Sequence, residues 1–344
     1  MELQPVTKED NQIKIWTDPP ADKLGNSVKD FLNHLGGPTW IDVTGRDCSR
    51  CRVVTTLLHG NEPSGTKTLY QWLMSGTIPE VTMHFLVCSV EAALTTPEFS
   101  NRHLPDRPDM NRCFKPPFDG VEGRVAEQVI NRIRSLAPEA VVDIHNTSGS
   151  GPDFTVTSHL TDKHRALAAR LSCRLIYTGI KLGALMEVEL GIPIITLEAG
   201  GSWDLEADLT AMKAIGHLTA ENDLFAAQAA PEVDLFAHPM RLEALPGTTL
   251  DYDTEKSSET DLTLHRDIEH HNFGVTAKDT ALGWAGEDIL ERLVVQDYDG
   301  KNRVRELFYV DGGEFCTACD LRLFMVTTRP RIALSDCLFY LVKA

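Results

Sequence analysis

The sequence of 344 residues predicts an α/β protein with a mixed, mostly parallel central sheet that carries helices on both faces. A smaller, β-rich domain is predicted at the C-terminus. Two observations carry this prediction. Apolar, strand-like runs alternate with helix-like segments from Arg52 to about residue 230, which is typical of βαβ units. After Phe236 the segments are short, strand-like and broken by Gly and Pro.

The change of pattern near Ala230-Pro231 marks the predicted domain boundary. We therefore assign residues 1–234, with a lead-in over 1–50, to the first domain and residues 235–344 to the second. A chain of this length suffices for one large domain and one smaller one.

Each element is predicted from its local pattern. The lead-in holds a helix over 27–35, stopped by Gly36-Gly37-Pro38, and a strand-like stretch over 39–45. Runs rich in β-branched and apolar residues predict strands over 52–59, 81–90, 140–146, 153–158, 174–178 and 192–200. Apolar spacing and N-cap residues predict helices over 64–76, with Ser64 as N-cap, and over 123–136, 161–173 and 204–227. In the second domain, strands are predicted over 248–253, 271–277, 288–296, 303–310, 321–328 and 337–343.

The connection between Ser89 and Gly123 is predicted to have little regular structure and is rich in Pro, Asp and Arg. A connection of this length inside a compact domain is usually functional.

Charge and hydropathy exclude some classes of function. The formal net charge of -17 argues against nucleic-acid binding, which usually needs a basic stripe. No apolar run approaches the roughly 20 residues that span a bilayer, and the polar N-terminus does not read as a signal peptide. We expect a cytoplasmic protein without a membrane partner, and a homo-oligomer is left open.

Two CxxC pairs stand out among the eight cysteines, Cys48/Cys51 and Cys316/Cys319. Together they would suit a four-cysteine structural zinc site. Reduced thiols without a metal are the favoured interpretation, because the two pairs lie far apart in the sequence.

Polar side chains follow three of the predicted strands. His59 and Glu62 come after the first, His145 ends the next, and Glu198 ends a third. Open α/β sheets build their sites beyond the carboxyl ends of the strands. Two histidines and one glutamate suit one catalytic zinc ion per chain with a coordination position left for water, and Glu198 is then a free carboxylate able to move a proton. Asp143 is either a group that orients a ligand histidine or a plain strand-end carboxylate.

The segments "HGNEPSG", "DMNRCF", "DIHNTSG" and "IPIITLEAG" resemble the signature segments of the succinylglutamate desuccinylase/aspartoacylase family, a branch of the zinc carboxypeptidase-like fold. The resemblance spans residues 50 to 230 in the family's order. It implies that His59, Glu62 and His145 bind zinc and that Glu198 is the general base and acid. It also implies a smaller C-terminal β domain that narrows the pocket.

The resemblance further implies how a substrate would be held. Asn111 and Arg112 would bind a substrate carboxylate, since a planar guanidinium grips a carboxylate bidentately. An arginine upstream of this pair would polarise the scissile carbonyl, with Arg102 as the candidate and Arg107 as the reserve.

The sequence also departs from the family. Aspartoacylase has an arginine about ten residues before the catalytic glutamate, whereas this chain has Glu187 and Glu189 there. A substrate with a cationic or neutral side group is therefore at least as compatible as an acidic one. Tyr252 and Tyr309 are the alternatives for a tyrosine that lines the pocket in some members.

These observations predict a zinc-dependent amidohydrolase that cleaves an N-acyl amino acid or a related small amide. The runner-up is a carboxypeptidase-like metallopeptidase acting on short peptides. A binding protein that has kept the fold without catalysis is the third alternative.

Overall fold

The computed structural model describes residues 13–147, 149–226, 232–297, 299–335 and 337–344. Two earlier predictions lie outside these residues. One is that the polar N-terminal segment is not a signal peptide, and the other is the change of pattern at Ala230-Pro231. The described residues divide into two compact units. One contains those of 1–146 and 153–235, and the other those of 147–152 and 236–344.

The first unit is built on a nine-stranded mixed sheet in the order β1-β2-β4-β3-β5-β8-β6-β7-β9. Parallel pairs (β1 with β2, β3 with β4 and β5, β6 with β7) outnumber the antiparallel pairs β2 with β4 and β6 with β8. The strands are β1 Lys14–Thr17, β2 Thr39–Val43, β3 Asp47–Thr56, β4 Val81–Val87, β5 Val141–Thr147, β6 Phe154–Thr157, β7 Arg174–Tyr177, β8 Ile194–Gly201 and β9 Asp234–Ala237. The helices are α1 Val28–Leu35, α2 Ser64–Met74, α3 Val90–Leu94, α4 Gly120–Leu136, α5 Asp162–Leu171 and α6 Leu205–Ala220.

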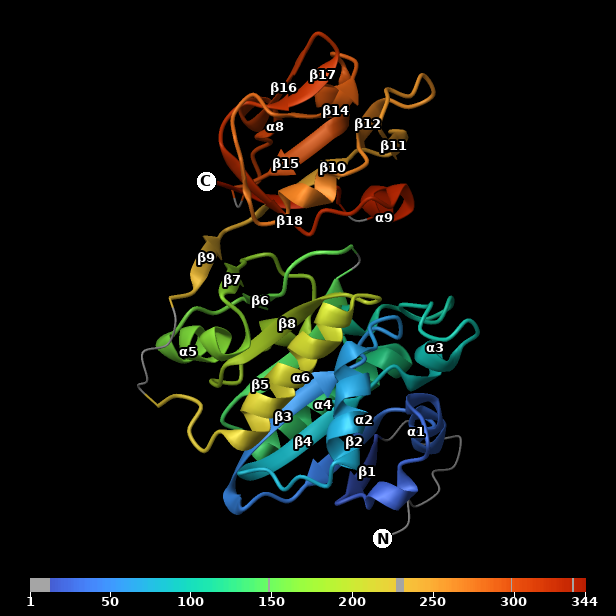
Figure 1. The fold of residues 1–344 in the computed structure, drawn as a ribbon, viewed down its shortest axis with the longest axis vertical. Helices are drawn as coiled ribbons and strands as arrows, with labels where there is room; N and C mark the ends of the chain where they lie inside the picture. The colour runs from blue at the N-terminus through green and yellow to red at the C-terminus, as the bar shows by residue number, and fades with distance from the viewer. Residues whose placement is uncertain (1–12, 148, 227–231, 298, 336) are drawn as a thin grey trace. The chain divides into compact units, whose positions relative to one another are not determined.

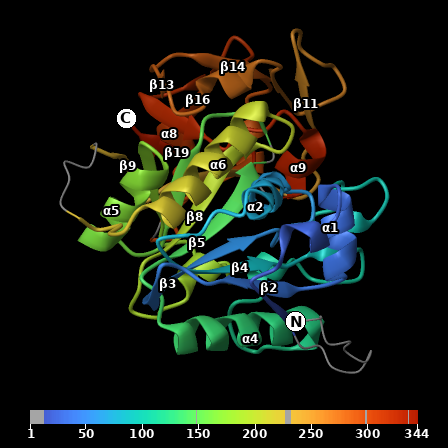
Figure 2. The ribbon, with the colours of Figure 1, turned by 60° about the horizontal axis from the view of Figure 1, so that its bottom comes forward.

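Helices cover both faces of this sheet. Figure 1 shows α2 and α6 in front of the strands, and Figure 2 shows α4 on the opposite face. The central strand β3 explains why both faces need cover, because Val53 packs in the cluster with α4 while Val54 packs in the cluster with α2 and α6. A strand buried on both sides reads as a continuous apolar run, which is why β3 could be recognised from the sequence.

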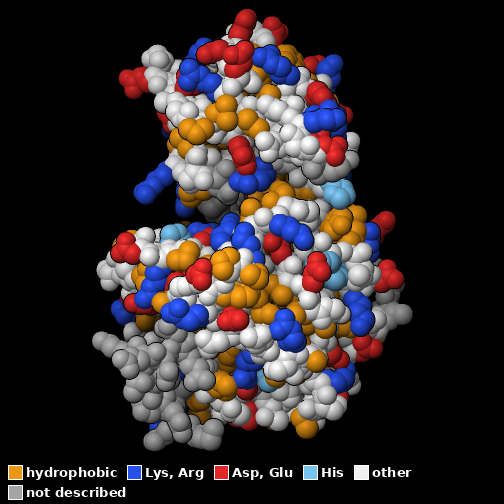
Figure 3. Space-filling model, turned by 180° about the vertical axis from the view of Figure 1, so that it is seen from behind, with side chains coloured by type: hydrophobic (Ala, Val, Ile, Leu, Met, Phe, Trp, Pro, Cys, Tyr) orange, Lys and Arg blue, Asp and Glu red, His pale blue; other side chains and the backbone are white. Residues whose placement is uncertain are grey.

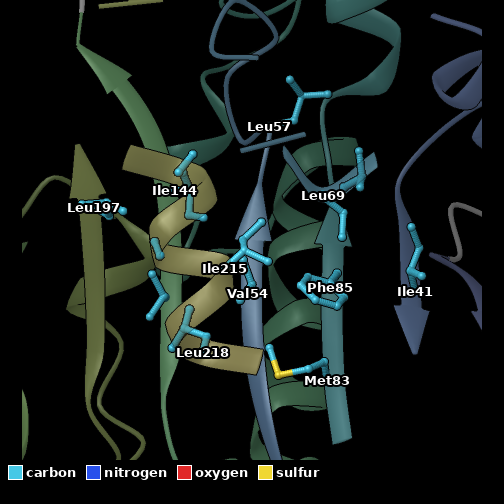
Figure 4. Packing of buried hydrophobic residues seen from close by; sticks show 14 of the residues in the cluster. Ile41, Val54, Leu57, Leu69, Met83, Phe85, Ile144, Leu197, Ile215 and Leu218 are labelled. Atoms are coloured by element: carbon cyan, nitrogen blue, oxygen red, sulfur yellow. The ribbon is translucent and has the colours of Figure 1, made fainter. Parts of the chain in front are cut away.

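The close-up in Figure 4 shows how the helix side chains fit between the strands. Ile215 of α6 lies over Val54 of β3, Leu197 lies on β8 beyond Ile144, and Leu69 of α2 lies above Phe85. Each of these residues is at most 1% exposed to solvent. The resulting core holds β3, β5 and β8 in register and so fixes the positions of their carboxyl ends.

The second unit contains two five-stranded sheets, β13-β18-β19-β10-β15 and β11-β12-β14-β17-β16. The strand pairs within them are antiparallel except for β11 with β12. The elements are β10 Met240–Ala244, β11 Leu250–Asp253, β12 Leu262–His265, β13 Val275–Thr276, β14 Ala281–Ala285, α7 Ile289–Arg292, β15 Leu293–Gln296, α8 Val304–Leu307, β16 Phe308–Asp311, β17 Glu314–Thr317, β18 Leu321–Phe324, α9 Pro330–Ser335 and β19 Phe339–Lys343. The predicted mixed α/β architecture with a β-rich C-terminal region is therefore confirmed.

Some predicted element bounds are wrong. The segments 288–296 and 303–310 were predicted as strands, but each begins with a four-residue helix, α7 and α8, before the strand starts. The helix predicted over 204–227 ends at Ala220. The predicted N-cap, Ser64, is instead the first residue of α2, and Pro63 occupies the N-cap position. The Ser64 hydroxyl donates to Asp208 Oδ1 at 2.6 Å.

Candidate metal centre

His59 and His145 are brought together by two adjacent parallel strands. Thr55 of β3 lies opposite Asp143 of β5, and Thr56 opposite Ile144. Since the carboxyl ends of parallel strands meet at the same sheet edge, the turn after β3 and the end of β5 are neighbours. The loop that carries Arg102, between Ser89 and Gly123, is also anchored at this edge.

The turn after β3 depends on close backbone approach. A Cβ added to Gly60 would lie 2.7 Å from the Ala92 Cβ and 2.7 Å from the Asn101 carbonyl oxygen. Gly60 N–H also donates to the carbonyl oxygen of Arg102 at 2.9 Å. A glycine is therefore required here, and it ties the turn to the loop that carries Arg102.

Three potential metal ligands lie at this edge. The Nδ1 atom of His59 is 2.8 Å from Glu62 Oε1, the Nδ1 atom of His145 is 2.6 Å from Glu62 Oε2, and the two Nδ1 atoms are 3.1 Å apart. Each side chain is at least 94% buried. Among the described residues this is the one group of three or more His, Cys, Asp or Glu side chains close enough to share a metal ion. Two imidazole nitrogens and a carboxylate oxygen are a donor set that suits Zn²⁺.

The other ring nitrogen of each histidine is held by a carboxylate. His59 Nε2 lies 2.9 Å from Asp109 Oδ1, and His145 Nε2 lies 2.7 Å from Asp143 Oδ2. Thr55 Oγ1 in turn donates to Asp143 Oδ1 at 2.5 Å. A carboxylate on one ring nitrogen orients the ring and raises the basicity of the other nitrogen, as around metal-bound histidines in general. Of the two interpretations of Asp143, the geometry favours the one that orients a ligand.

The charges at this centre are strongly coupled. Burial alone would raise the pKa of Glu62, but His59 and His145 hold it well below its usual range. Burial alone would lower the pKa of His145, but Asp143 and Glu62 raise it well above its ordinary value. The centre therefore attracts positive charge, whether a proton or a metal cation.

Asp109 is a residue that sequence reasoning missed. Besides His59 it accepts a hydrogen bond from Arg102 Nε at 2.9 Å and one from the backbone N–H of Asn111 at 2.8 Å. Burial alone would raise its pKa, but His59 and Arg102 hold that pKa well below the usual range. Asp109 is the first residue of the "DMNRCF" segment, in which only Asn111 and Arg112 were predicted to be functional.

The structure separates the two candidate arginines. Arg102 NH1 lies 3.2 Å from Glu62 Oε1, so its guanidinium reaches the metal-ligand group. Arg107 instead lies 3.3 Å from Glu91 and 3.5 Å from Glu122. Burial alone would lower the pKa of Arg102, but Glu62 and Asp109 outweigh this effect and raise that pKa above its ordinary value. The guanidinium therefore stays charged.

Glu198 lies on β8, next to β5 in the sheet, and is paired with Phe154 of β6. Burial raises the pKa of Glu198 to about 7, with Glu62 adding to the effect and His145 opposing it. A carboxyl group with a pKa near neutrality is suited to accept and return a proton at physiological pH.

Asn146 fixes the sheet edge between β5 and β8. Its backbone N–H donates to Glu62 Oε2 at 3.2 Å, and its Nδ2 donates to Ser64 Oγ at 2.9 Å and to the Gly200 carbonyl at 3.0 Å. Because Gly200 follows Glu198 by two residues, these bonds connect the position of Glu198 to that of the ligand Glu62.

Residues 53–220 match the model of the succinylglutamate desuccinylase/aspartoacylase catalytic domain. This match identifies a succinylglutamate desuccinylase/aspartoacylase catalytic domain over residues 53–220. No curated protein matches it in sequence. Similarity to solved structures extends over most of the chain at low identity, so it shows the fold alone.

Three solved structures illustrate this similarity. A succinylglutamate desuccinylase/aspartoacylase from Rhodobacter sphaeroides is 16% identical, with a TM-score of 0.55 over 84% of this chain and 83% of the other. Murine aminoacylase 3 is 16% identical, with a TM-score of 0.52 over 87% and 97%. The succinylglutamate desuccinylase from Chromobacterium violaceum is 13% identical, with a TM-score of 0.52 over 88% of both chains.

At the position where aspartoacylase has its further arginine, Glu187 has a structural role. Its carboxylate accepts hydrogen bonds from the backbone N–H groups of Leu182 and Gly183 at 2.8 and 2.9 Å. Glu189 is 71% exposed and lies 3.6 Å from His159. Of the two glutamates, only Glu189 has an exposed carboxylate to offer a cationic group.

The same loop contacts the predicted substrate-binding pair, Asn111 and Arg112. Leu185 N–H donates to Asn111 Oδ1 at 3.0 Å, and Arg112 NH1 donates to the Asn111 carbonyl at 2.9 Å. Asn111 is 93% buried. The pair thus follows Asp109, which accepts the Asn111 backbone N–H and itself contacts His59.

The remaining sequence candidates lie elsewhere. The two CxxC pairs are in different units, Cys48/Cys51 in the first and Cys316/Cys319 in the second, and all four are free cysteines. In the second unit, Tyr309 OH donates to Asp279 at 2.9 Å, whereas Tyr252 is buried.

Two surface properties bear on partners. Basic and acidic side chains are interspersed on the face shown in Figure 3, with no continuous basic stripe. Within the described part of the chain, every helix is too short or too polar to cross a lipid bilayer.

Proposed function

We propose that this protein is a zinc-dependent amidohydrolase that removes the acyl group from an N-acyl amino acid or a related small amide. The observation that carries the proposal is the buried set of His59, Glu62 and His145, in which carboxylates occupy the outer ring nitrogens and leave both Nδ1 atoms to converge. This donor arrangement fits Zn²⁺ with a coordination position left for water. Bound zinc would lower the pKa of such a water toward ~7 and stabilise negative charge on a carbonyl oxygen.

Glu198 is the proposed proton carrier. It would take the proton of the attacking water as the oxygen adds to the amide carbon, and would deliver that proton to the departing amine nitrogen. A pKa raised to about 7 supports both halves of this cycle, because the group is readily ionised and readily protonated near neutrality.

Arg102 is proposed to donate hydrogen bonds to the carbonyl oxygen of the scissile amide. Asp109 and Glu62 hold its guanidinium at the metal-ligand group, so its charge is in place before the substrate binds. A preorganised cation of this kind stabilises the oxyanion that develops as water adds.

Asn111 and Arg112 are proposed to bind the α-carboxylate of the amino acid. Asn111 Oδ1 is already used by Leu185, so its Nδ2 is the half of the amide that remains for a ligand. Glu189 is exposed, whereas the Glu187 carboxylate accepts hydrogen bonds from the loop backbone. An exposed carboxylate in this loop supports a substrate whose side group is neutral or cationic.

The test is a panel of N-acyl amino acids set against a panel of short peptides with free C-termini, both assayed with the zinc-loaded protein. Glu198→Gln is the matched blank. We expect hydrolysis of N-acyl amino acids, and a loss of about 10²- to 10⁴-fold in kcat for the variant while its zinc content stays unchanged.

Faster cleavage of the peptides would establish a carboxypeptidase-like enzyme instead. A variant as active as the parent would refute the role of Glu198. Binding without turnover on either panel, by a zinc-loaded protein, would establish a non-catalytic binding protein.

A further inference from the structure

Helix α6 has an apolar outer face in addition to its buried one. Its inner face packs Ala211, Ala214, Ile215 and Leu218 into the core. On the outer face Leu205 is 77% exposed, Leu209 49% and Met212 47%. A helix at the surface of a globular protein normally presents polar residues to solvent. Figure 1 shows α6 in front of the sheet, at the surface of the first unit.

These residues form one continuous stripe. Leu205, Leu209, Met212 and Gly216 follow one another at intervals of four, three and four residues, which places them on a single face of α6. We call these four residues the α6 seam. Its spacing is that of the contact positions of a two-helix coiled coil, and it extends about 17 Å along the axis.

Gly216 gives the seam one open position. A Cβ added there would meet no atom within 4 Å, so the space outside this glycine is free. A large side chain from a partner helix could rest against the backbone at this point. Gly216 therefore leaves a space for a large side chain of the partner, whereas Leu205, Leu209 and Met212 are large side chains that project from the helix.

We propose that the α6 seam is the contact between two copies of this chain, packed antiparallel about a twofold axis. A twofold contact must be self-complementary. In an antiparallel pair centred between Leu209 and Met212, each Leu209 faces Met212 of the other copy. The large Leu205 then faces the open space at Gly216.

Charge on the flank of the α6 seam favours a second copy in this orientation. Glu206 and Lys213 are both exposed and lie seven residues apart, on the same side of the seam. Antiparallel pairing brings Glu206 of one copy opposite Lys213 of the other, twice by symmetry. Parallel pairing would place the two copies of this flank on opposite sides of the helix pair, so that Glu206 and Lys213 would not meet.

The α6 seam alone is smaller than the ~800 Å² that each partner contributes to a standard interface. Trp203, which is 74% exposed and lies just before α6, extends the apolar surface at one end. The contact is therefore predicted to include Trp203 and the Glu206–Lys213 flank, and to be of moderate affinity.

The experiment measures the mass of the full-length protein by sedimentation equilibrium at micromolar concentration. We expect a dimer, with twice the 38.1 kDa of one chain. Leu209→Arg should raise the dimer Kd by at least about 30-fold, since each copy would bury a charged side chain against Met212 of the other. Ile78→Arg, at another exposed apolar side chain (58%), is the matched control and should leave the mass unchanged.

Charge reversal tests the orientation independently of any effect on folding. Glu206→Lys and Lys213→Glu should each weaken the dimer, and the double variant should restore it. A monomeric parent protein would overturn the proposal. So would a dimer insensitive to Leu209→Arg, or one that the single reversals leave intact.

Discussion

Strand β3 carries one buried polar cluster at its middle and another just beyond its carboxyl end, and the two clusters differ in how their hydrogen bonds are used. At the middle of the strand, Arg52 is fully buried. Its guanidinium donates to Glu139 at 2.8 Å and to the backbone carbonyls of Leu218, Glu221 and Asn222 at 2.6–3.0 Å. These bonds point outward from one cation to acceptors all around it. The charge is compensated by Glu139, and four N–H groups of the guanidinium have acceptors within the protein.

At the carboxyl end the direction is reversed. The His59 and His145 nitrogens and the Glu62 oxygens point toward one another, at 2.6–3.1 Å. Outer carboxylates hold each ring in place, so the donor atoms converge on a common point. A buried set that needs a cation to complete it is a candidate functional site, whereas a buried set that is complete contributes to the fold.

The first prediction tests the Arg52 cluster at the middle of β3. Arg52→Met should reduce the free energy of unfolding by about 3 kcal/mol, because Glu139 and three backbone carbonyls lose a buried partner. Denaturant unfolding measures this difference. The activity of each folded molecule should stay the same. A drop in activity larger than the drop in the folded fraction would contradict the separation of the two clusters.

The second prediction tests the outer carboxylates at the carboxyl end. Asp109→Asn and Asp143→Asn should each weaken zinc binding by about 10- to 100-fold, because each removes the charged acceptor of one ligand histidine. Competition with a chelator of known affinity measures the change. Asp42→Asn is a matched control, since Asp42 also contacts a histidine, His84, but away from the centre. Equal losses for all three variants would refute the proposed role.

A third prediction concerns pH in the metal-free protein. The pKa of His145 is raised in the fold, so protonated His145 contributes stability that is fully present below its ordinary pKa of ~6.5. That contribution is lost as pH rises through the raised pKa. The unfolding free energy of the chelator-treated parent, measured relative to His145→Gln, should therefore fall with rising pH. With zinc bound the trend should reverse, since protons compete with the metal. A pH-independent difference would contradict the coupling.

The smallest effect is expected at Arg50, which shares Glu139 with Arg52 but is one-third exposed. Arg50→Ala should cost much less than Arg52→Met, because partly solvated ion pairs contribute little. Denaturant unfolding beside Arg52→Met gives the comparison. An equal cost at both positions would show that burial does not set the difference.

The sequence was most informative where local pattern and chemistry coincide. His59 and His145 could be recognised because each comes at the end of an apolar run, and the structure places them at one sheet edge. Their roles, and that of Glu198, stay predictions. Asp109 was missed because it lies in an irregular loop, where no periodicity signals which carboxylate turns inward. The role of Glu187 in holding a loop backbone is equally invisible without coordinates.

Element bounds failed for a related reason. Helices α7 and α8 have four residues each and lead directly into strands, so their apolar residues fit a strand pattern equally well. Helix α6 shows a different limit. Its outer leucines read as ordinary helix residues until the structure shows which of them are exposed.

The most direct test of the central claim is the zinc content of the purified protein, measured beside Glu62→Gln and His145→Gln. About one zinc ion per chain is expected in the parent, because the described residues hold one suitable ligand group. Each variant should lose the ion while keeping the parent's circular dichroism. Zinc retained at full occupancy by both folded variants, or a parent protein that binds no divalent metal, would contradict the account.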